Sequence, residues 1–162
     1  ISDAVEIFGL LAHTANESTD KTRFWFKPHP ATSQSQIQDV FDSVWPKQFE
    51  FVVGDFNELV EKANLLISSA SSAAMETLAK GIPVIVVGNN SGLTRNPIPK
   101  TITEDIWSLC YSSQEIAGAI LFYQNRSDEK TKEYKEIGKQ IRAEFFEPVT
   151  RGGVRQFLGI ED

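Results

Sequence analysis

Segments with two different periods alternate along this chain, and this alternation limits the possible folds more than any other feature. Short runs rich in aromatic or β-branched residues predict strands, and longer runs with apolar residues every three or four positions predict helices. The expected strands cover residues 23–27, 49–53, 64–68, 83–87 and 107–111. The expected helices cover 3–15, 33–44, 55–63, 73–80, 112–123, 127–146 and 153–158. This order predicts an α/β domain with a doubly wound, mostly parallel sheet and helices on both faces.

Four pairs of polar residues have the spacing of side-chain caps at the expected helix starts. In each pair a short polar side chain stands three residues before Glu or Gln, so that both can satisfy amides of the first helical turn. The pairs are Asp3 with Glu6, Ser33 with Gln36, Asp55 with Glu58 and Ser112 with Glu115. Gly81 follows helix 73–80 in the position of a C-cap. Strand 83–87 is apolar on both faces, which is typical of a parallel strand covered by helices.

The helix expected at 127–146 is highly charged. Asp128 stands four residues before Lys132, and Glu136 stands three before Lys139. These spacings place opposite charges side by side on a helix. The pattern therefore predicts a solvated helix.

The composition is that of a single acidic domain. The chain has 162 residues, with 16 Lys and Arg against 22 Asp and Glu, which gives a net charge of −6 and a pI near 5.0. We expect 1–162 to form one domain, and the negative charge disfavours a nucleic-acid partner. The one cysteine cannot form an internal disulfide. The aliphatic stretch at 82–87 is too short to span a membrane and no signal peptide is visible, so we expect a soluble, cytoplasmic protein.

The segments that follow the expected strands are where a ligand site should lie, because ligands of parallel sheets bind beyond the carboxyl ends of the strands. The usual nucleotide-binding patterns are missing, since the sequence contains neither GxGxxG nor GxxxxGK[ST]. It also lacks a D-x-D pair that could hold a metal on a diphosphate, and a cluster of Cys and His that could bind zinc. We therefore predict no metal site.

A serine-rich turn follows strand 64–68 and is the most informative of these segments. Its members are Ser68, Ser69, Ser71 and Ser72. Amides and the dipole at a helix N-terminus favour an anion, and small hydroxyls add donors there, so the turn predicts a phosphate site. Glu76 lies one helical turn further on, where its carboxylate could accept hydrogen bonds from ribose hydroxyls. The alternative is a helix cap with more serines than it needs.

The residue His29 follows the first expected strand and stands between Pro28 and Pro30. The two prolines stiffen its backbone. An imidazole on a rigid loop can donate to a phosphate oxygen or supply a proton to a leaving phosphate. The alternative is an ordinary turn with His29 facing water. Lys27 is equally open to either interpretation.

The loop 88–99 is long for a connection between a strand and a helix, and long loops at this edge are often functional. Asn89, Asn90 and Arg95 could contact a sugar or phosphate, or the loop could be a solvated excursion. His13 is expected at the surface. Cys110 lies within a predicted strand and is expected to fill the core.

Three motifs together resemble the C-terminal, nucleotide-binding half of GT-B glycosyltransferases, and most closely the bacterial surface-polysaccharide transferases with an HP motif. Residues 27–30, Lys-Pro-His-Pro, are similar to the HP motif, and 68–72 are similar to its serine motif. Residues 75–84 are similar to the E-x-L-x-x-G-x-P-V segment of GT-B donor domains. The resemblance covers residues 23–123 and implies a Rossmann-like fold.

The resemblance also implies roles for individual residues. His29 would be catalytic at the donor phosphate, and Glu76 would hold the ribose. The other nucleotide and phosphate contacts would be Lys27, Pro30, Ser68, Ser69, Ser71 and Ser72. The donor would be a CMP- or UDP-linked sugar that needs no metal and no further cofactor. The family has a second, N-terminal domain for a glycan or lipid-linked acceptor, and a chain that starts at Ile1 without that domain is expected to be a piece of a longer protein.

These implications predict the donor-binding domain of a glycosyltransferase in surface polysaccharide or lipopolysaccharide biosynthesis. On its own the domain is expected to be inactive, and the whole protein could associate peripherally with the inner face of the membrane. Two alternatives stay open. One is a domain like that of the UDP-sugar 2-epimerases, which share this architecture. The other is a non-catalytic nucleotide-binding or interaction module.

Overall fold

The strands of this protein pair only in parallel within the residues that the structure, a computed structural model, describes: 2–17, 22–28, 34–39, 46–90, 94–146, 148 and 150–159. Strand β1 (Phe24–Phe26) pairs with β2 (Phe49–Phe51). Strands β3 (Leu66–Ser68), β4 (Val84–Val87) and β5 (Trp107–Cys110) form a second group in the order β3-β4-β5. The prediction of an α/β domain with parallel strands is confirmed, although the strands form two small hydrogen-bonded sheets.

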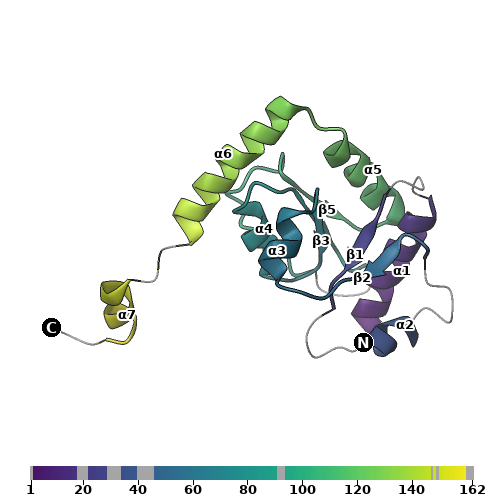
Figure 1. The fold of residues 1–162 in the computed structure, drawn as a ribbon, viewed down its shortest axis with the longest axis horizontal. Coiled ribbons are helices and arrows are strands. Elements are labelled where there is room, and N and C mark those ends of the chain that lie inside the picture. The colour runs from purple at the N-terminus through teal and green to yellow at the C-terminus, as the bar shows by residue number, and fades with distance from the viewer. Residues whose placement is uncertain are drawn as a thin grey trace.

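The helices alternate with these strands as the periodicity predicts (Figure 1). Their bounds are α1 Ser2–Glu17, α2 Gln34–Gln38, α3 Phe56–Glu61, α4 Ala73–Leu78, α5 Ser113–Gln124, α6 Asp128–Phe145 and α7 Arg151–Phe157. Ser112 and Glu115 form the expected capping box at the start of α5, and Asp55 caps α3 by accepting from the amides of Asn57 and Glu58. The side chains of the pairs expected at residues 3 and 6 and at 33 and 36 lie outside the described residues.

One hydrophobic core joins the two sheets. Every residue of β4 is buried, as its two apolar faces predict. Helix α4 packs on β3 and β4, while α5 packs on β4 and β5 and also contacts α1. Figure 1 shows α3 and α4 together on one side of the strands, with α1 and α5 on the other. The same core cluster includes Phe49 of β2 and takes in the partly buried Phe24 and Phe26 of β1.

Residues at the amino ends of the two sheets line one hollow at the surface. Thr22 precedes β1 and Asn64 precedes β3, and both residues line this hollow. Within the described residues, no hydrogen-bonded strand pair joins the β1-β2 sheet to the β3-β4-β5 sheet.

Helix α6 crosses the amino end of the β3-β4-β5 sheet and is not fully solvated, so that part of the prediction is wrong. Its charges face water, and Lys139 pairs with Glu136 at 2.6 Å as predicted. Tyr134, Gly138 and Ile141 recur at helical spacing and are buried. The charged side chains between them obscured this stripe in the sequence.

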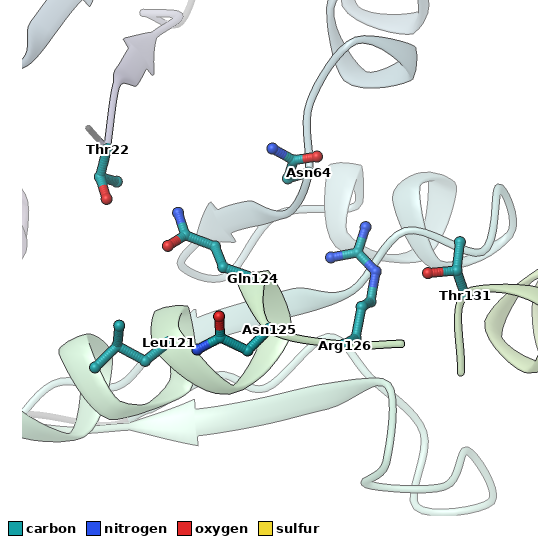
Figure 2. A pocket seen from close by; sticks show the side chains of 7 residues that line it. All are labelled: Thr22, Asn64, Leu121, Gln124, Asn125, Arg126 and Thr131. Carbon is teal, nitrogen blue, oxygen red and sulfur yellow. The ribbon is translucent and has the colours of Figure 1, made fainter. Parts of the chain in front are cut away.

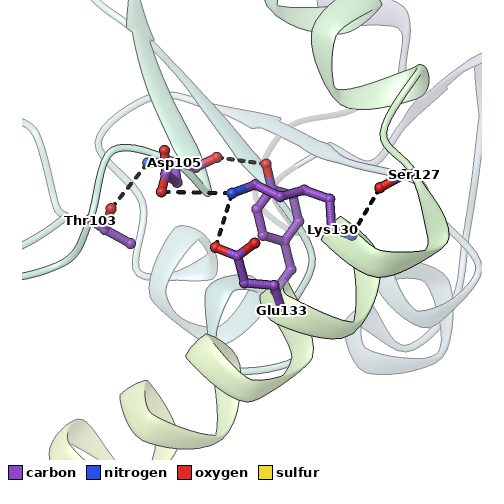
Figure 3. Close-up of polar contacts among 6 residues, drawn as sticks. Thr103, Asp105, Ser127, Lys130 and Glu133 are labelled. Atoms are coloured by element: carbon purple, nitrogen blue, oxygen red, sulfur yellow. Dashed lines mark hydrogen bonds and ion pairs between the residues drawn. The ribbon is translucent and has the colours of Figure 1, made fainter.

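Two contacts fix α6 in this position. The hydroxyl of Tyr134 donates to the carbonyl of Asp105, just before β5, at 2.6 Å (Figure 3). Gly138 packs against the turn after α4, where Gly81 has a φ of 72° that favours glycine. A Cβ at Gly138 would lie 2.4 Å from the Gly81 nitrogen, so the two backbones are in direct contact.

Helix α7 stands apart from the rest of the fold in Figure 1. It contains no buried residue, and the side chain of Phe157 is 89% exposed. The helix begins at Arg151, two residues before the start of the expected range 153–158. Thr150 caps it by accepting from the amide of Gly153.

Candidate functional site

Strand pairing brings two of the predicted segments to one edge of the sheet. Ser68 lies opposite Val86, so the serine turn leaves β3 beside the point where loop 88–99 leaves β4. Lys27 follows the carboxyl end of β1 and is exposed. Lys27 belongs to the β1-β2 sheet, whereas the serine turn follows a strand of the β3-β4-β5 sheet. The strand register therefore brings together the serine turn and loop 88–99.

Within the serine turn, two hydroxyls serve the turn itself. The Ser68 hydroxyl donates to the carbonyl of Ser69 at 3.2 Å, and the Ser71 hydroxyl accepts from the amide of Ala73 at 3.3 Å. The amide of Ser71 also donates to the Ser69 carbonyl, at 2.7 Å. Ser71 is therefore the residue that caps the start of α4. This part of the cluster fits the alternative interpretation, a structural helix cap.

The other two hydroxyls, those of Ser69 and Ser72, have no hydrogen bond among the described residues. Ser72 is exposed and occupies the N-cap position without making a side-chain cap bond. Ser69 is half-buried. A small hydroxyl that serves no turn or cap is free to donate to a ligand oxygen.

The backbone amides at the start of α4 are less available than the sequence predicts. The amide of Ala73 donates to the Ser71 hydroxyl, the amide of Ala74 to the Ser71 carbonyl, and the amide of Met75 to the Ser72 carbonyl. The tight turn thus satisfies groups that a helix N-terminus usually leaves open. A phosphate here would depend mainly on side-chain hydroxyls.

Glu76 lies in the first turn of α4 and is half-buried. It follows Ser72 by four residues, which places the two on the same side of the helix. A carboxylate at this position also interacts favourably with the helix dipole, so its location has a structural as well as a ligand-binding explanation.

The asparagines after β4 help to hold their own loop in place. The amide of Asn89 donates to the hydroxyl of Thr94 at 3.0 Å, and the side chain of Asn90 donates to the carbonyl of Tyr111 at 2.8 Å. A Cβ at Gly88 would overlap the ring of Tyr111, so a larger residue there would require the ring to move. The sequence analysis missed Tyr111, although a glycine directly after a buried strand was a signal of close packing.

Several predicted residues need separate mention. His29 and Pro30 lie outside the described residues, as do 91–93 of the loop. Arg95 is exposed. His13 is exposed on α1 and Cys110 is buried, as expected. Burial, and to a lesser extent the charge of Glu115, raises the pKa of Cys110 to about 11, so its thiol stays protonated at neutral pH and is a poor nucleophile.

The described part of the chain contains neither a cluster of metal ligands nor a membrane-spanning helix. No three His, Cys, Asp or Glu side chains of those residues cluster as metal ligands. No helix among them is both long enough and apolar enough to cross a bilayer.

Comparisons with protein-family models, with curated proteins and with solved structures found no match. The candidate site has two hydroxyls without a partner among the described residues and a carboxylate one helical turn away, all after the carboxyl end of β3. An exposed lysine follows the carboxyl end of β1, in the other sheet. This set can bind a phosphate and a polyhydroxyl group next to each other.

Proposed function

We propose that this domain binds the nucleotide-sugar donor of a glycosyltransferase that acts in surface polysaccharide or lipopolysaccharide biosynthesis. The position of the serine turn is the observation that carries the proposal. The turn follows the carboxyl end of β3, beside the loop that follows β4. Ligands of open α/β sheets bind beyond the carboxyl ends of the strands. The motif resemblance at 27–30, 68–72 and 75–84 supports the same assignment.

In this proposal the donor phosphate lies against the serine turn. The hydroxyls of Ser69 and Ser72 donate to phosphate oxygens, and Glu76 accepts from the ribose hydroxyls. Lys27, at the end of β1 in the other sheet, supplies a positive charge. Small, rotatable hydroxyls suit this task because they adjust to a phosphate without filling the space it needs.

The chemistry proposed is transfer of a sugar with the nucleotide phosphate as the leaving group. Negative charge grows on that phosphate as the glycosidic bond breaks, and donors fixed beforehand stabilise it. His29 is proposed to hold or protonate the leaving phosphate, with Pro28 and Pro30 restricting its backbone. The donor is proposed to be a CMP- or UDP-linked sugar bound without metal. The acceptor, a glycan or lipid-linked sugar, would be held by a further domain, and the protein would act in the cytoplasm at the inner face of the membrane.

A second candidate function is a non-catalytic interaction module. The observation that favours it is the engagement of the Ala73, Ala74 and Met75 amides within the turn. A phosphate site that uses a helix N-terminus normally leaves such amides open. This candidate predicts no affinity for any nucleotide.

Calorimetric titration with CMP, CDP, UDP and GDP, with and without Mg²⁺, tests the proposal. We expect saturable binding of CMP or UDP without metal. Ser72→Asp should weaken that binding at least about tenfold, because it places a carboxylate beside the phosphate. The change should leave the fold intact, because Ser72 is exposed and its side chain makes no cap bond. Gln140→Glu adds the same charge on the exposed face of α6 and should change nothing. Absence of nucleotide binding would favour the interaction module, and equal binding by Ser72→Asp would remove the serine turn from the site.

A further inference from the structure

A polar hollow of about 490 Å³ lies at the amino edge of the sheets, on the opposite side of the fold from the serine turn. It lies between the residues that precede β1 and β3 and the turn where the end of α5 meets the start of α6 (Figure 2). The polar side chains that line it are Thr22, Asn64, Gln124, Asn125, Arg126 and Thr131. Its volume is in the usual range of small-molecule sites.

Arg126 is the one charged residue among those that line this hollow. Its side chain is half-buried, and the guanidinium makes one hydrogen bond among the described residues, to the carbonyl of Tyr123 at 2.6 Å. A guanidinium has five N–H donors, so this bond leaves most of them unused. Figure 2 shows the guanidinium extending toward Asn64, between Gln124 and Thr131. The carboxylates in the first turn of α6, Asp128 and Glu129, do not line the hollow.

The neighbouring cation, Lys130, differs from Arg126 because it has acidic partners. Its ammonium lies 2.9 Å from Glu133 and 3.7 Å from Asp105, and it lies over the ring of Tyr134 (Figure 3). Lys130 lines a second hollow, of about 660 Å³, which shares Arg126 with the first. Two carboxylates thus satisfy Lys130, whereas no described carboxylate pairs with Arg126. Of the two cations that line these hollows, Arg126 is therefore the one without a carboxylate partner among the described residues.

We propose that the hollow binds a small organic oxyanion, a carboxylate or a phosphate, through the guanidinium of Arg126. A planar guanidinium binds such groups with two parallel hydrogen bonds. The amides of Asn64 and Gln124 and the hydroxyls of Thr22 and Thr131 would donate to the remaining oxygens. The site is separate from the proposed nucleotide site and does not depend on it.

The test is calorimetric titration of the chain with inorganic phosphate and, separately, with citrate, so that the two kinds of oxyanion are distinguished. We expect saturable binding of at least one probe. Arg126→Gln and Asn64→Asp should each weaken it at least about tenfold, which is about 1.4 kcal/mol. Asn64→Asp keeps the size of the side chain but faces the guanidinium with a carboxylate. Asn64 is exposed and makes no side-chain hydrogen bond among the described residues, so this variant tests the site even if Arg126→Gln fails to fold.

A control variant makes the result specific. Arg142→Gln removes an exposed charge from α6 and should leave the affinity unchanged. The proposal is overturned if neither probe binds saturably, if Arg126→Gln and Asn64→Asp bind like the unchanged chain, or if Arg142→Gln causes the same loss.

Discussion

The two edges of the sheet differ in how their polar and small residues are used. At the amino edge, Gly138 of α6 packs directly on Gly81, and the hydroxyl of Tyr134 is bonded to the carbonyl of Asp105. At the carboxyl edge, the hydroxyls of Ser69 and Ser72 have no partner among the described residues. The contacts of Gly138 and Tyr134 therefore hold α6 in place, whereas the two serine hydroxyls are groups that the fold itself does not need. The difference indicates where the nucleotide should bind, because a rigid scaffold can carry exposed functional groups on its loops.

The contact between α6 and the turn at Gly81 should be the most sensitive point of the structural edge. Gly138→Ala would place a Cβ within 3 Å of three backbone atoms, so we expect a loss of about 3 kcal/mol in the free energy of unfolding. Gly118→Ala is the matched control, since a Cβ on that helical glycine meets nothing within 4 Å. It should stabilise the protein slightly, as alanine is the better helix former. Urea unfolding measures both variants, and equal stability of the two would show that the backbone contact does not fix α6.

The buried tyrosines Tyr123 and Tyr134, whose rings are in contact, should make the protein sensitive to alkaline pH. Burial raises the pKa of the Tyr123 phenol from its ordinary value of 10.0 to about 12. The phenol therefore ionises at a lower pH in the unfolded chain than in the folded chain. The contribution of neutral Tyr123 to the free energy of unfolding is fully present below pH 10 and is lost as the pH rises to 12. The loss from Tyr123 should be about 3 kcal/mol. Burial also raises the pKa of Tyr134, which adds to the effect.

Urea unfolding at several pH values from 8 to 12 measures this loss. In Tyr123→Phe the slope of unfolding free energy against pH should be shallower between pH 10 and 12, because the variant lacks the buried phenol. The variant also loses the 2.8 Å hydrogen bond between Tyr123 and Ser108. This loss lowers the unfolding free energy by the same amount at every pH from 10 to 12, so it does not change the slope. An unchanged slope would mean that Tyr123 ionises as easily in the folded protein as in the unfolded chain.

Two serines of the same turn should separate stability from binding. Ser71→Ala removes the side chain that accepts from the Ala73 amide, so the unfolding free energy should fall by about 1 kcal/mol. Ser72→Ala removes a hydroxyl without a partner among the described residues and should leave stability unchanged while it weakens nucleotide binding. Thermal unfolding and calorimetry on both variants give the comparison. If Ser72→Ala were the less stable variant, its hydroxyl would be part of the fold.

The alternation of periods was sufficient to predict the class of fold and the order of its elements. Local chemistry that acts within one turn was also predictable, as the capping box of Ser112 and Glu115 and the buried strand β4 show. These features depend on neighbours in the sequence, so a single sequence contains the information. The buried face of α6 was missed because charged residues surround Tyr134 and Gly138, and only tertiary packing distinguishes that face from the others.

The candidate site was predictable in its composition but not in its details. The sequence identified the serine turn and loop 88–99, and strand register places them at one edge. It could not distinguish Ser71, which caps α4, from Ser72, which does not. It also gave no sign of the hollow at Arg126, because that hollow is formed by residues from widely separated segments, such as Thr22 and Asn64.

The central claim is that the serine turn is the donor site. Its most direct test is an NMR titration of the isotope-labelled chain with CMP and UDP, in which the chemical shifts of the backbone amides are recorded. The account predicts saturable shift changes at residues 69–72, 76 and 88–90 with one of these nucleotides. Amides around Gly81, Gly138 and Arg126 should stay unchanged. Saturable changes confined to the amino edge, or no saturable change with either nucleotide, would contradict the assignment of the serine turn as the donor site.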